Sequence, residues 1–188
     1  MPKHEFDKSE SNIVGILRSG EVVIDRPNSH NHLAGEFLRE ALGLVNSDDR
    51  DHLVETVDMG RVIGVSRCVQ TTVRDTIVYA HRLGRNGPTR FVLGREPEPT
   101  TNATVVLKRD RTLLGTMILI TAWAGAHSEA EPWDPHHTEE SKEVSRRFWA
   151  SHALVPVAEP GDEIDFSRPG GIVGQISADY LEDCGFLL

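Results

Sequence analysis

Residues 103–108 (ATVVLK) and 114–123 (LGTMILITAW) decide the fold class that the sequence predicts. Both stretches are rich in β-branched and other apolar residues, and the polar residues Asp110 and Arg111 lie between them. Two apolar runs joined by polar residues in this way are typical of a β-hairpin. An antiparallel sheet is therefore expected at the centre of the fold.

Further strand candidates precede this hairpin, over 61–65, 71–82 and 89–93. Between them and the hairpin, residues 95–100 contain two prolines. This segment is predicted to be a loop, because proline cannot donate a hydrogen bond to a strand ladder and restricts the residue before it. Residues 61–123 are thus expected to form one antiparallel, meander-like sheet.

Helices are expected before and after the sheet. Apolar residues recur at helical spacing over 30–45, with Asn28 or Ser29 as a possible N-cap. A second short helix is expected over 47–55, and Thr138 is expected to cap a C-terminal helix. A Gly-containing turn also predicts an N-terminal hairpin over 13–24.

The predicted class is α+β, with N-terminal helices packed on a central antiparallel sheet and one further C-terminal helix. The chain divides into an N-terminal hairpin or arm (1–28), an α+β core domain (29–155) and an acidic C-terminal extension (156–188). A length of 188 residues fits this arrangement, because a domain of that size can bury a sizeable core.

Charge is distributed unevenly along the chain. Residues 61–111 hold ten Lys/Arg and four Asp/Glu, a net charge of +6, whereas the remainder holds ten basic and 25 acidic residues, a net charge of −15. This asymmetry suggests that one face of the protein meets an anion. The alternative is that acidic helices pack around a basic sheet and neutralise it.

Several classes of protein are not indicated by the motifs. The two cysteines, Cys68 and Cys184, form neither a disulfide framework nor a zinc pattern. The spacing of His136 and His137 does not suit a metal site, so no metal and no cofactor are expected. A phosphate-binding loop, a dinucleotide fingerprint and a nucleophile elbow are all missing.

Targeting signals are not recognisable either. The N-terminus lacks the apolar stretch of a signal peptide, and the longest apolar run, 113–126, is too short to span a bilayer. A cytoplasmic protein without a membrane partner is the default expectation. A toxin delivered by a dedicated secretion machine would also lack these signals.

What remains is a basic sheet with interspersed histidines. Metal-independent RNA cleavage needs a base, an acid and cations on the phosphate, which His and Arg side chains can supply. A helical histidine before a basic sheet that ends in a Thr-Ala-aromatic run resembles the barnase/RelE-like ribonuclease toxins. The matching residues here are His52, Arg82, Arg90, Lys108 and 121–123 (TAW). The chain also resembles a small bacterial protein family of unassigned function through 57–64, 90–100 and 148–155.

The resemblance implies a metal-independent endoribonuclease of toxin type with RNA as its partner. It implies catalytic roles for His52, Arg90 and Thr121, and substrate-binding roles for Arg82, Lys108 and Trp123. Such toxins are usually basic, whereas this chain carries a net charge of −9. A non-catalytic binding, immunity or regulatory module that docks a basic protein partner through acidic faces is the alternative. An enzyme acting on a small anionic metabolite is a third hypothesis, and the oligomeric state stays open.

Overall fold

The computed structural model describes residues 13–26, 30–82, 85–156 and 178–186. They belong to two compact units that alternate along the chain. Unit 1 comprises 1–65 and 99–127, and unit 2 comprises 66–98 and 128–188. These units are assembled from separate segments, whereas the predicted division followed the chain order.

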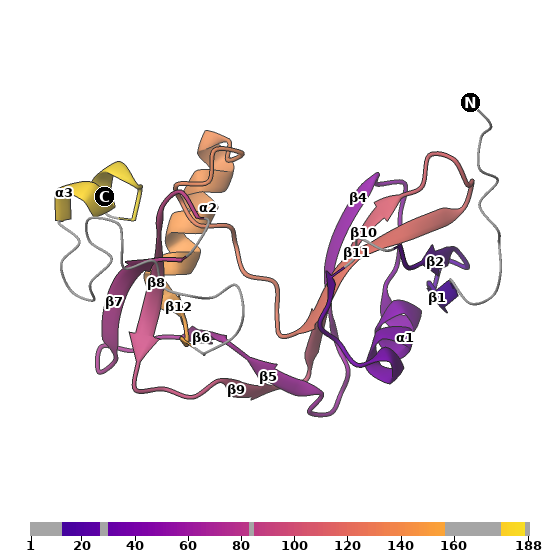
Figure 1. Cartoon of the computed structure of the whole chain (residues 1–188), viewed down its shortest axis with the longest axis horizontal. Helices are drawn as coiled ribbons and strands as arrows, with labels where there is room; N and C mark the ends of the chain where they lie inside the picture. Colours follow the sequence, from indigo (N-terminus) through magenta and orange to yellow (C-terminus); the bar gives the residue numbers. More distant parts are fainter. Residues whose placement is uncertain (1–12, 27–29, 83–84, 157–177, 187–188) are drawn as a thin grey trace. The chain divides into compact units, whose positions relative to one another are not determined.

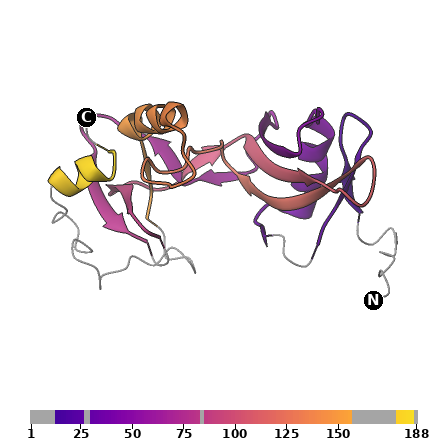
Figure 2. The same cartoon turned by 90° about the horizontal axis from the view of Figure 1, so that it is seen from above.

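Unit 1 is built on a six-stranded sheet (Figures 1 and 2). The strand order is β1-β2-β11-β10-β4, and β3 also pairs with β11. The central β10–β11 and β10–β4 pairs are antiparallel, whereas β2 and β3 run parallel to β11. The strands are β1 (Ile13–Ile16), β2 (Val22–Ile24), β3 (His30–Asn31), β4 (His52–Asp58), β10 (Asn102–Arg109) and β11 (Thr116–Ala124).

The core of unit 1 lies between this sheet and helix α1 (Gly35–Leu44). Leu38, Ala41 and Leu42 of α1 form one apolar cluster with alternate residues of the strands. The strand residues of this cluster include Leu53, Val57, Ala103, Val105, Leu107, Met117, Leu119 and Ala122. Alternate residues of a strand point to opposite faces, so the odd-numbered residues of β10 face the helix.

Two short strands join the units. Strands β5 (Gly64–Ser66) and β9 (Glu98–Thr100) pair with each other in a two-stranded sheet. Residues 95–100 were predicted to be a loop, but residues 98–100 of this segment form strand β9, which contains Pro99. In a two-stranded ribbon a residue can face away from the partner strand, and a missing N–H is tolerated there.

Unit 2 contains a four-stranded sheet in the order β6-β12-β8-β7. Strands β7 and β8 form an antiparallel hairpin, and β12 is parallel to β8 and antiparallel to β6. The bounds are β6 (Cys68–Gln70), β7 (Thr76–His81), β8 (Pro88–Leu93) and β12 (His152–Leu154). The helices are α2 (Glu139–Ser151) and α3 (Ala178–Asp183).

The N-cap of α2 was correctly predicted. The Thr138 side chain accepts a hydrogen bond from the Ser141 backbone, and the Ser141 hydroxyl accepts one from the Thr138 backbone. This reciprocal capping box satisfies two backbone donors that would otherwise lack partners at the helix start. Glu139 and Glu140 lie in the first turn, where negative charge favours the helix dipole.

The predicted fold class is wrong in its central feature. The described residues form three sheets and three short helices, instead of several N-terminal helices on one central sheet. The predicted meander does not exist, since β8 and β10 belong to different sheets. The predicted hairpins over 13–24 and 103–123 are confirmed.

The segment 47–55 was predicted as a second helix, but residues from His52 onward form strand β4. The cap signal at Ser47 and Asp48 is local, whereas β4 pairs with β10 along its whole length. This tertiary pairing overrides the weak helical preference. Helix α1 also starts later than predicted, at Gly35, and the proposed caps Asn28 and Ser29 lie outside the described residues.

Within the described ranges no helix is long and apolar enough to cross a membrane.

Candidate functional site

The unit 1 sheet has a second face, opposite α1, that is not covered by a described helix of this unit. We call it the open face. Its residues alternate with the core residues and come from three adjacent strands. They include His52, Val54, Thr56 and Asp58 of β4, Asn102, Thr104, Val106 and Lys108 of β10, and Ile118, Thr121 and Trp123 of β11.

His52 and Lys108 lie directly opposite each other on this face. The register of β4 and β10 pairs the two residues, and both are exposed. Opposed residues of antiparallel strands have Cβ atoms about 4.5–5.5 Å apart. Within the described part of the chain, Lys108 has no carboxylate within ion-pairing distance. An imidazole and an unneutralised ammonium group are therefore neighbours on an accessible surface.

Thr121 lies on the next strand of the same face. It pairs with Val106, which is two residues before Lys108 and is the next residue of β10 on this face. A β-bulge between Val106 and Leu107 shifts the register at this point. Residues diagonal to each other across two strands are about 7–8 Å apart, within reach of a long side chain. Lys108 thus lies between His52 and Thr121, so three predicted site residues are neighbours.

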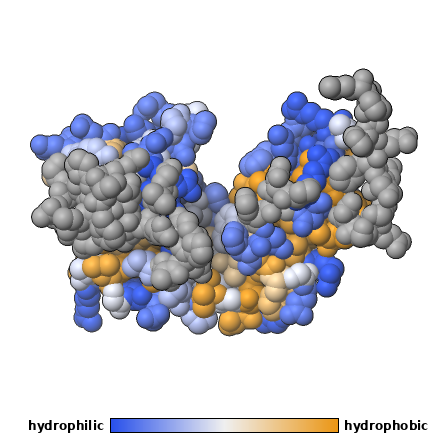
Figure 3. Space-filling view, in the orientation of Figure 1, coloured by the Kyte–Doolittle hydropathy of each residue, from blue (hydrophilic) through white to orange (hydrophobic). Residues whose placement is uncertain are grey.

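The bulge also exposes apolar surface on unit 1. Ile120, the extra residue of the bulge, is 39% exposed. Figure 3 shows apolar side chains at the surface of this unit. The large exposed ones are Ile13, Ile16, Leu44, Val62, Val65, Leu114 and Ile120.

Trp123 lies at the other end of the open face, half-buried. It pairs with Thr104, four residues along β10 from Lys108. The rise of about 3.4 Å per residue in an antiparallel strand separates the two ends by about 14 Å. The His127 ring lies beside the Trp123 ring, with centroids 6.4 Å apart.

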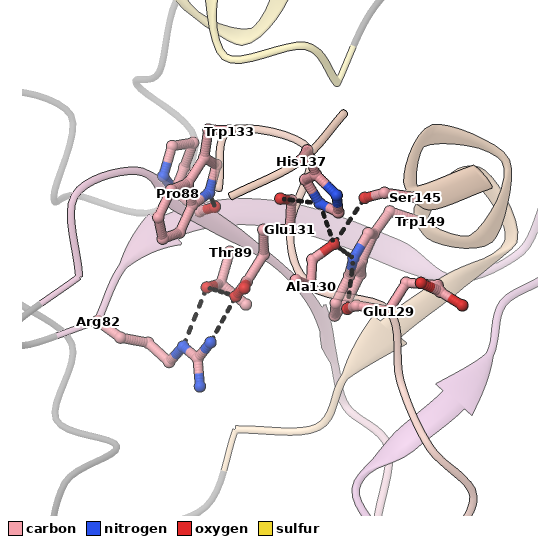
Figure 4. Close-up of polar contacts among 10 residues, drawn as sticks. All are labelled: Arg82, Pro88, Thr89, Glu129, Ala130, Glu131, Trp133, His137, Ser145 and Trp149. Atoms are coloured by element: carbon pink, nitrogen blue, oxygen red, sulfur yellow. Dashed lines mark hydrogen bonds and ion pairs between the residues drawn. The ribbon is translucent and has the colours of Figure 1, made fainter. Parts of the chain in front are cut away.

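Arg82 belongs to unit 2, where it is bound within a buried polar network (Figure 4). Its Nε donates to Thr89 Oγ1 at 3.0 Å, and its Nη2 forms an ion pair with Glu131. Thr89 Oγ1 in turn donates to Glu131 Oε1 at 2.7 Å. Since Thr89 and Glu131 are buried, this guanidinium is committed to an internal carboxylate.

Arg90 also lies in unit 2 and is committed to internal groups. Its Nη1 donates to the carbonyl oxygen of His152 at 2.6 Å and to Thr71 Oγ1 at 3.1 Å. These bonds connect β8 to the start of β12 and to the segment after β6. Burial raises the pKa of the neighbouring Tyr79 hydroxyl, and Arg90 offsets part of that rise. Both described hydrogen bonds of Arg90 go to internal acceptors, and they do not support the predicted catalytic role.

Four other arginines of the basic segment are paired with carboxylates, which reduces the cationic surface that the excess of +6 could form. The described pairs are Arg61–Glu40, Arg95–Asp75, Arg109–Glu21 and Arg111–Asp51.

The cysteines do not offer a reactive thiol. Burial raises the pKa of Cys68 to about 12, and a thiol is nucleophilic only as the thiolate. Burial also raises the pKa of Cys184; the hydrogen bond to Tyr180 offsets part of this rise, and the Asp183 charge adds a smaller increase. In the described segments no group of three or more His, Cys, Asp or Glu is arranged to hold a metal ion.

Two histidines on the open face were missed from the sequence. Neither His127 nor His32 was selected as a site residue. Their proximity to Trp123 depends on the path of the chain after β11 and on the pairing of β3 with β11. Neither feature leaves a local signal in the sequence.

Comparison with known proteins finds no family model, no curated protein and no solved structure that matches this chain. The resemblance to small ribonuclease toxins thus stays a prediction from the sequence.

Proposed function

We propose that the protein binds single-stranded RNA on the open face of unit 1 and cleaves it without a metal ion. One observation carries the proposal: strand register places His52, Lys108, Thr121 and Trp123 on the same face of one sheet. Arg82 and Arg90, which belong to unit 2, have no part in this revised site.

The chemistry follows from the His52–Lys108 pair. The neutral imidazole of His52 removes the proton from a ribose 2′-hydroxyl, and the 2′-oxygen attacks the adjacent phosphorus. The bond from phosphorus to the 5′-oxygen breaks, and water protonates the leaving oxygen. The products are a 2′,3′-cyclic phosphate and a 5′-hydroxyl.

Lys108 supplies the charge that this reaction needs. Its ammonium group lies beside His52 and faces the negative charge that develops on the phosphate oxygens. Because described carboxylates do not neutralise Lys108, it can bind a phosphate without first breaking an ion pair. The Thr121 side chain lies on the other side of Lys108, where its hydroxyl can contact a phosphate oxygen.

The test is cleavage of single-stranded RNA by the full chain in excess EDTA. We expect products ending in a cyclic phosphate, and a loss of about 100-fold or more in rate for His52→Ala, the range that a general base contributes. Lys108→Ala is expected to slow cleavage as well. Arg39→Ala is the matched control, because it removes one exposed positive charge from α1, on the opposite side of the sheet. Intact RNA with the wild-type chain would reject the catalytic proposal.

A non-catalytic module that docks a basic partner is the second candidate. It is favoured by unit 2, where Arg82 and Arg90 are bound internally and carboxylates remain exposed at Glu139, Glu140, Asp179, Glu182 and Asp183. Intact RNA together with salt-dependent binding of a Lys/Arg-rich peptide would select this function.

A further inference from the structure

The chain turns over the open face directly after β11. Gly125 has a φ of +126°, a backbone conformation that glycine adopts without strain. Its carbonyl oxygen accepts a hydrogen bond from Thr104 Oγ1 at 2.7 Å. The His127 backbone N–H then donates to Thr56 Oγ1 at 3.0 Å. Two threonines of the open face thus hold His127 in place beside Trp123.

A second histidine lies on the other side of Trp123. The His32 N–H donates to the carbonyl oxygen of Ala122 at 2.8 Å, which continues the parallel register of β3 and β11 by one residue. This register places His32 beside Trp123. Leu33 is buried in the core, so the alternation along the chain directs the exposed His32 to the open face.

An indole beside one imidazole, with a second histidine opposite it on the neighbouring strand, suits a flat, polar ring. The Trp123 ring offers a stacking surface, and imidazole nitrogens can donate or accept hydrogen bonds at the edge of a stacked ring. Nucleobases combine these two properties, and single-stranded RNA is commonly recognised by stacking bases on aromatic side chains. We infer that Trp123, His127 and His32 form a base-binding subsite, and that the ligand is an oligonucleotide that also reaches Lys108.

The length requirement comes from the distance between the two ends. Trp123 and Lys108 are about 14 Å apart along the sheet, as the strand rise requires. A strand stacked as in a duplex advances about 3.4 Å per nucleotide, so about four steps cover this distance. A mononucleotide reaches one end only, whereas an oligonucleotide of a few residues contacts both.

This inference rests on the proposed RNA-binding face but not on cleavage. The experiment therefore uses 2′-O-methyl oligonucleotides, which lack the attacking hydroxyl and cannot be cleaved by the proposed route. Fluorescence anisotropy measures their Kd for the full chain as the length increases from one to eight nucleotides. We expect the Kd to fall about tenfold or more over this series, as one additional stacked base can produce.

The variants distinguish the two ends. Trp123→Ala should remove most of the gain with length, Trp123→Phe should retain it, and His127→Ala and His32→Ala should reduce it. Lys108→Ala should weaken binding of the longer oligonucleotides, and Arg39→Ala should not. The thermal midpoint of each variant verifies that it is folded, and Trp123→Phe with His127→Ala replaces Trp123→Ala if that variant unfolds.

Equal affinity for mononucleotide and octanucleotide, or a length dependence that the substitutions at Trp123 and His127 leave unchanged, would overturn the inference. Length-dependent binding without any RNA cleavage would retain it and reject only the catalytic step. Cleavage of RNA without length-dependent binding would reject the base-binding subsite and retain the catalytic step.

Discussion

The positive side chains selected from the sequence have different surroundings in the two units. In unit 2, Arg82 is enclosed with Glu131 and Thr89, and Arg90 donates to a backbone carbonyl. In unit 1, His52 and Lys108 lie exposed and opposed on a sheet face. A basic strand residue is therefore available to a ligand only where the fold brings no acceptor to it. Residue type alone does not distinguish the two situations.

The largest expected effect concerns the buried pair of unit 2. Glu131→Ala leaves the Arg82 guanidinium with its side chain only 14% exposed and without its carboxylate. We expect a loss of about 3–5 kcal/mol in the free energy of unfolding, since removing the carboxylate breaks the ion pair of a largely buried guanidinium. Urea unfolding in a Trp123→Phe background reports on unit 2, because the two remaining tryptophans, Trp133 and Trp149, lie in that unit.

The exposed pair Arg61–Glu40 of unit 1 provides the control for this prediction. Glu40→Gln should leave the stability of unit 1, followed by hydrogen exchange of peptides from β10 and β11, unchanged, because exposed ion pairs are solvated and screened. If Glu131→Ala were as well tolerated as Glu40→Gln, the network in Figure 4 would not stabilise unit 2, and the contrast between the units would fail.

A smaller effect is expected at Gly87, where the chain passes against an aromatic ring. A Cβ atom at Gly87 would lie 2.4 Å from ring carbons of Trp133, whose Nε1 donates to the Pro88 carbonyl oxygen at 2.6 Å. Gly87→Ala should therefore destabilise unit 2 by about 1–3 kcal/mol, as overpacking of a filled site does. The same fluorescence-detected urea unfolding measures it.

Gly43 of α1 is the matched glycine in unit 1. Nothing lies within 4 Å of a Cβ built at Gly43. Gly43→Ala should stabilise the protein by about 0.5–1 kcal/mol, because alanine loses less backbone entropy in a helix. Opposite signs for these two Gly→Ala substitutions are expected, and equal signs would contradict the packing described at Trp133.

The smallest effect is a dependence of stability on pH in unit 1. Burial of the Asp110 carboxyl raises its pKa, but hydrogen bonds from Thr112 and the charge of Arg26 outweigh this, and the net pKa is lowered. A lowered folded pKa contributes stability above the unfolded value of about 3.9, and the contribution is lost as the pH falls through the folded pKa. The stability of the wild type should decrease in acid more steeply than that of Asp110→Asn.

Hydrogen exchange of peptides from β10 and β11, followed between neutral pH and pH 3, measures this difference with correction for the intrinsic exchange rates. Parallel curves for the wild type and Asp110→Asn would show that the Arg26–Asp110 pair does not stabilise unit 1. In that case Arg82–Glu131 would stabilise unit 2, whereas Arg26–Asp110 would not stabilise unit 1.

Part of the candidate site was predictable from the sequence. His52, Lys108, Thr121 and Trp123 were selected through the resemblance to small ribonuclease toxins, and strand register places all four on one face. Arg82 and Arg90 were selected on the same grounds, yet they belong to unit 2 and bind internal acceptors. The acceptors Glu131 and His152 are distant in sequence, so their role could not be foreseen.

By itself, the sequence determined the elements that depend on neighbouring residues. The hairpin of β10 and β11, the hairpin of β1 and β2, and the capped start of α2 follow from apolar runs, turn residues and a Thr N-cap. Only the tertiary structure decided that the segment after Ser47 becomes strand β4, how the strands divide between two sheets, and which cations are neutralised. The physical reason is that strand pairing and ion pairing join residues far apart in the chain, and their free energy is gained only once the fold brings those residues together.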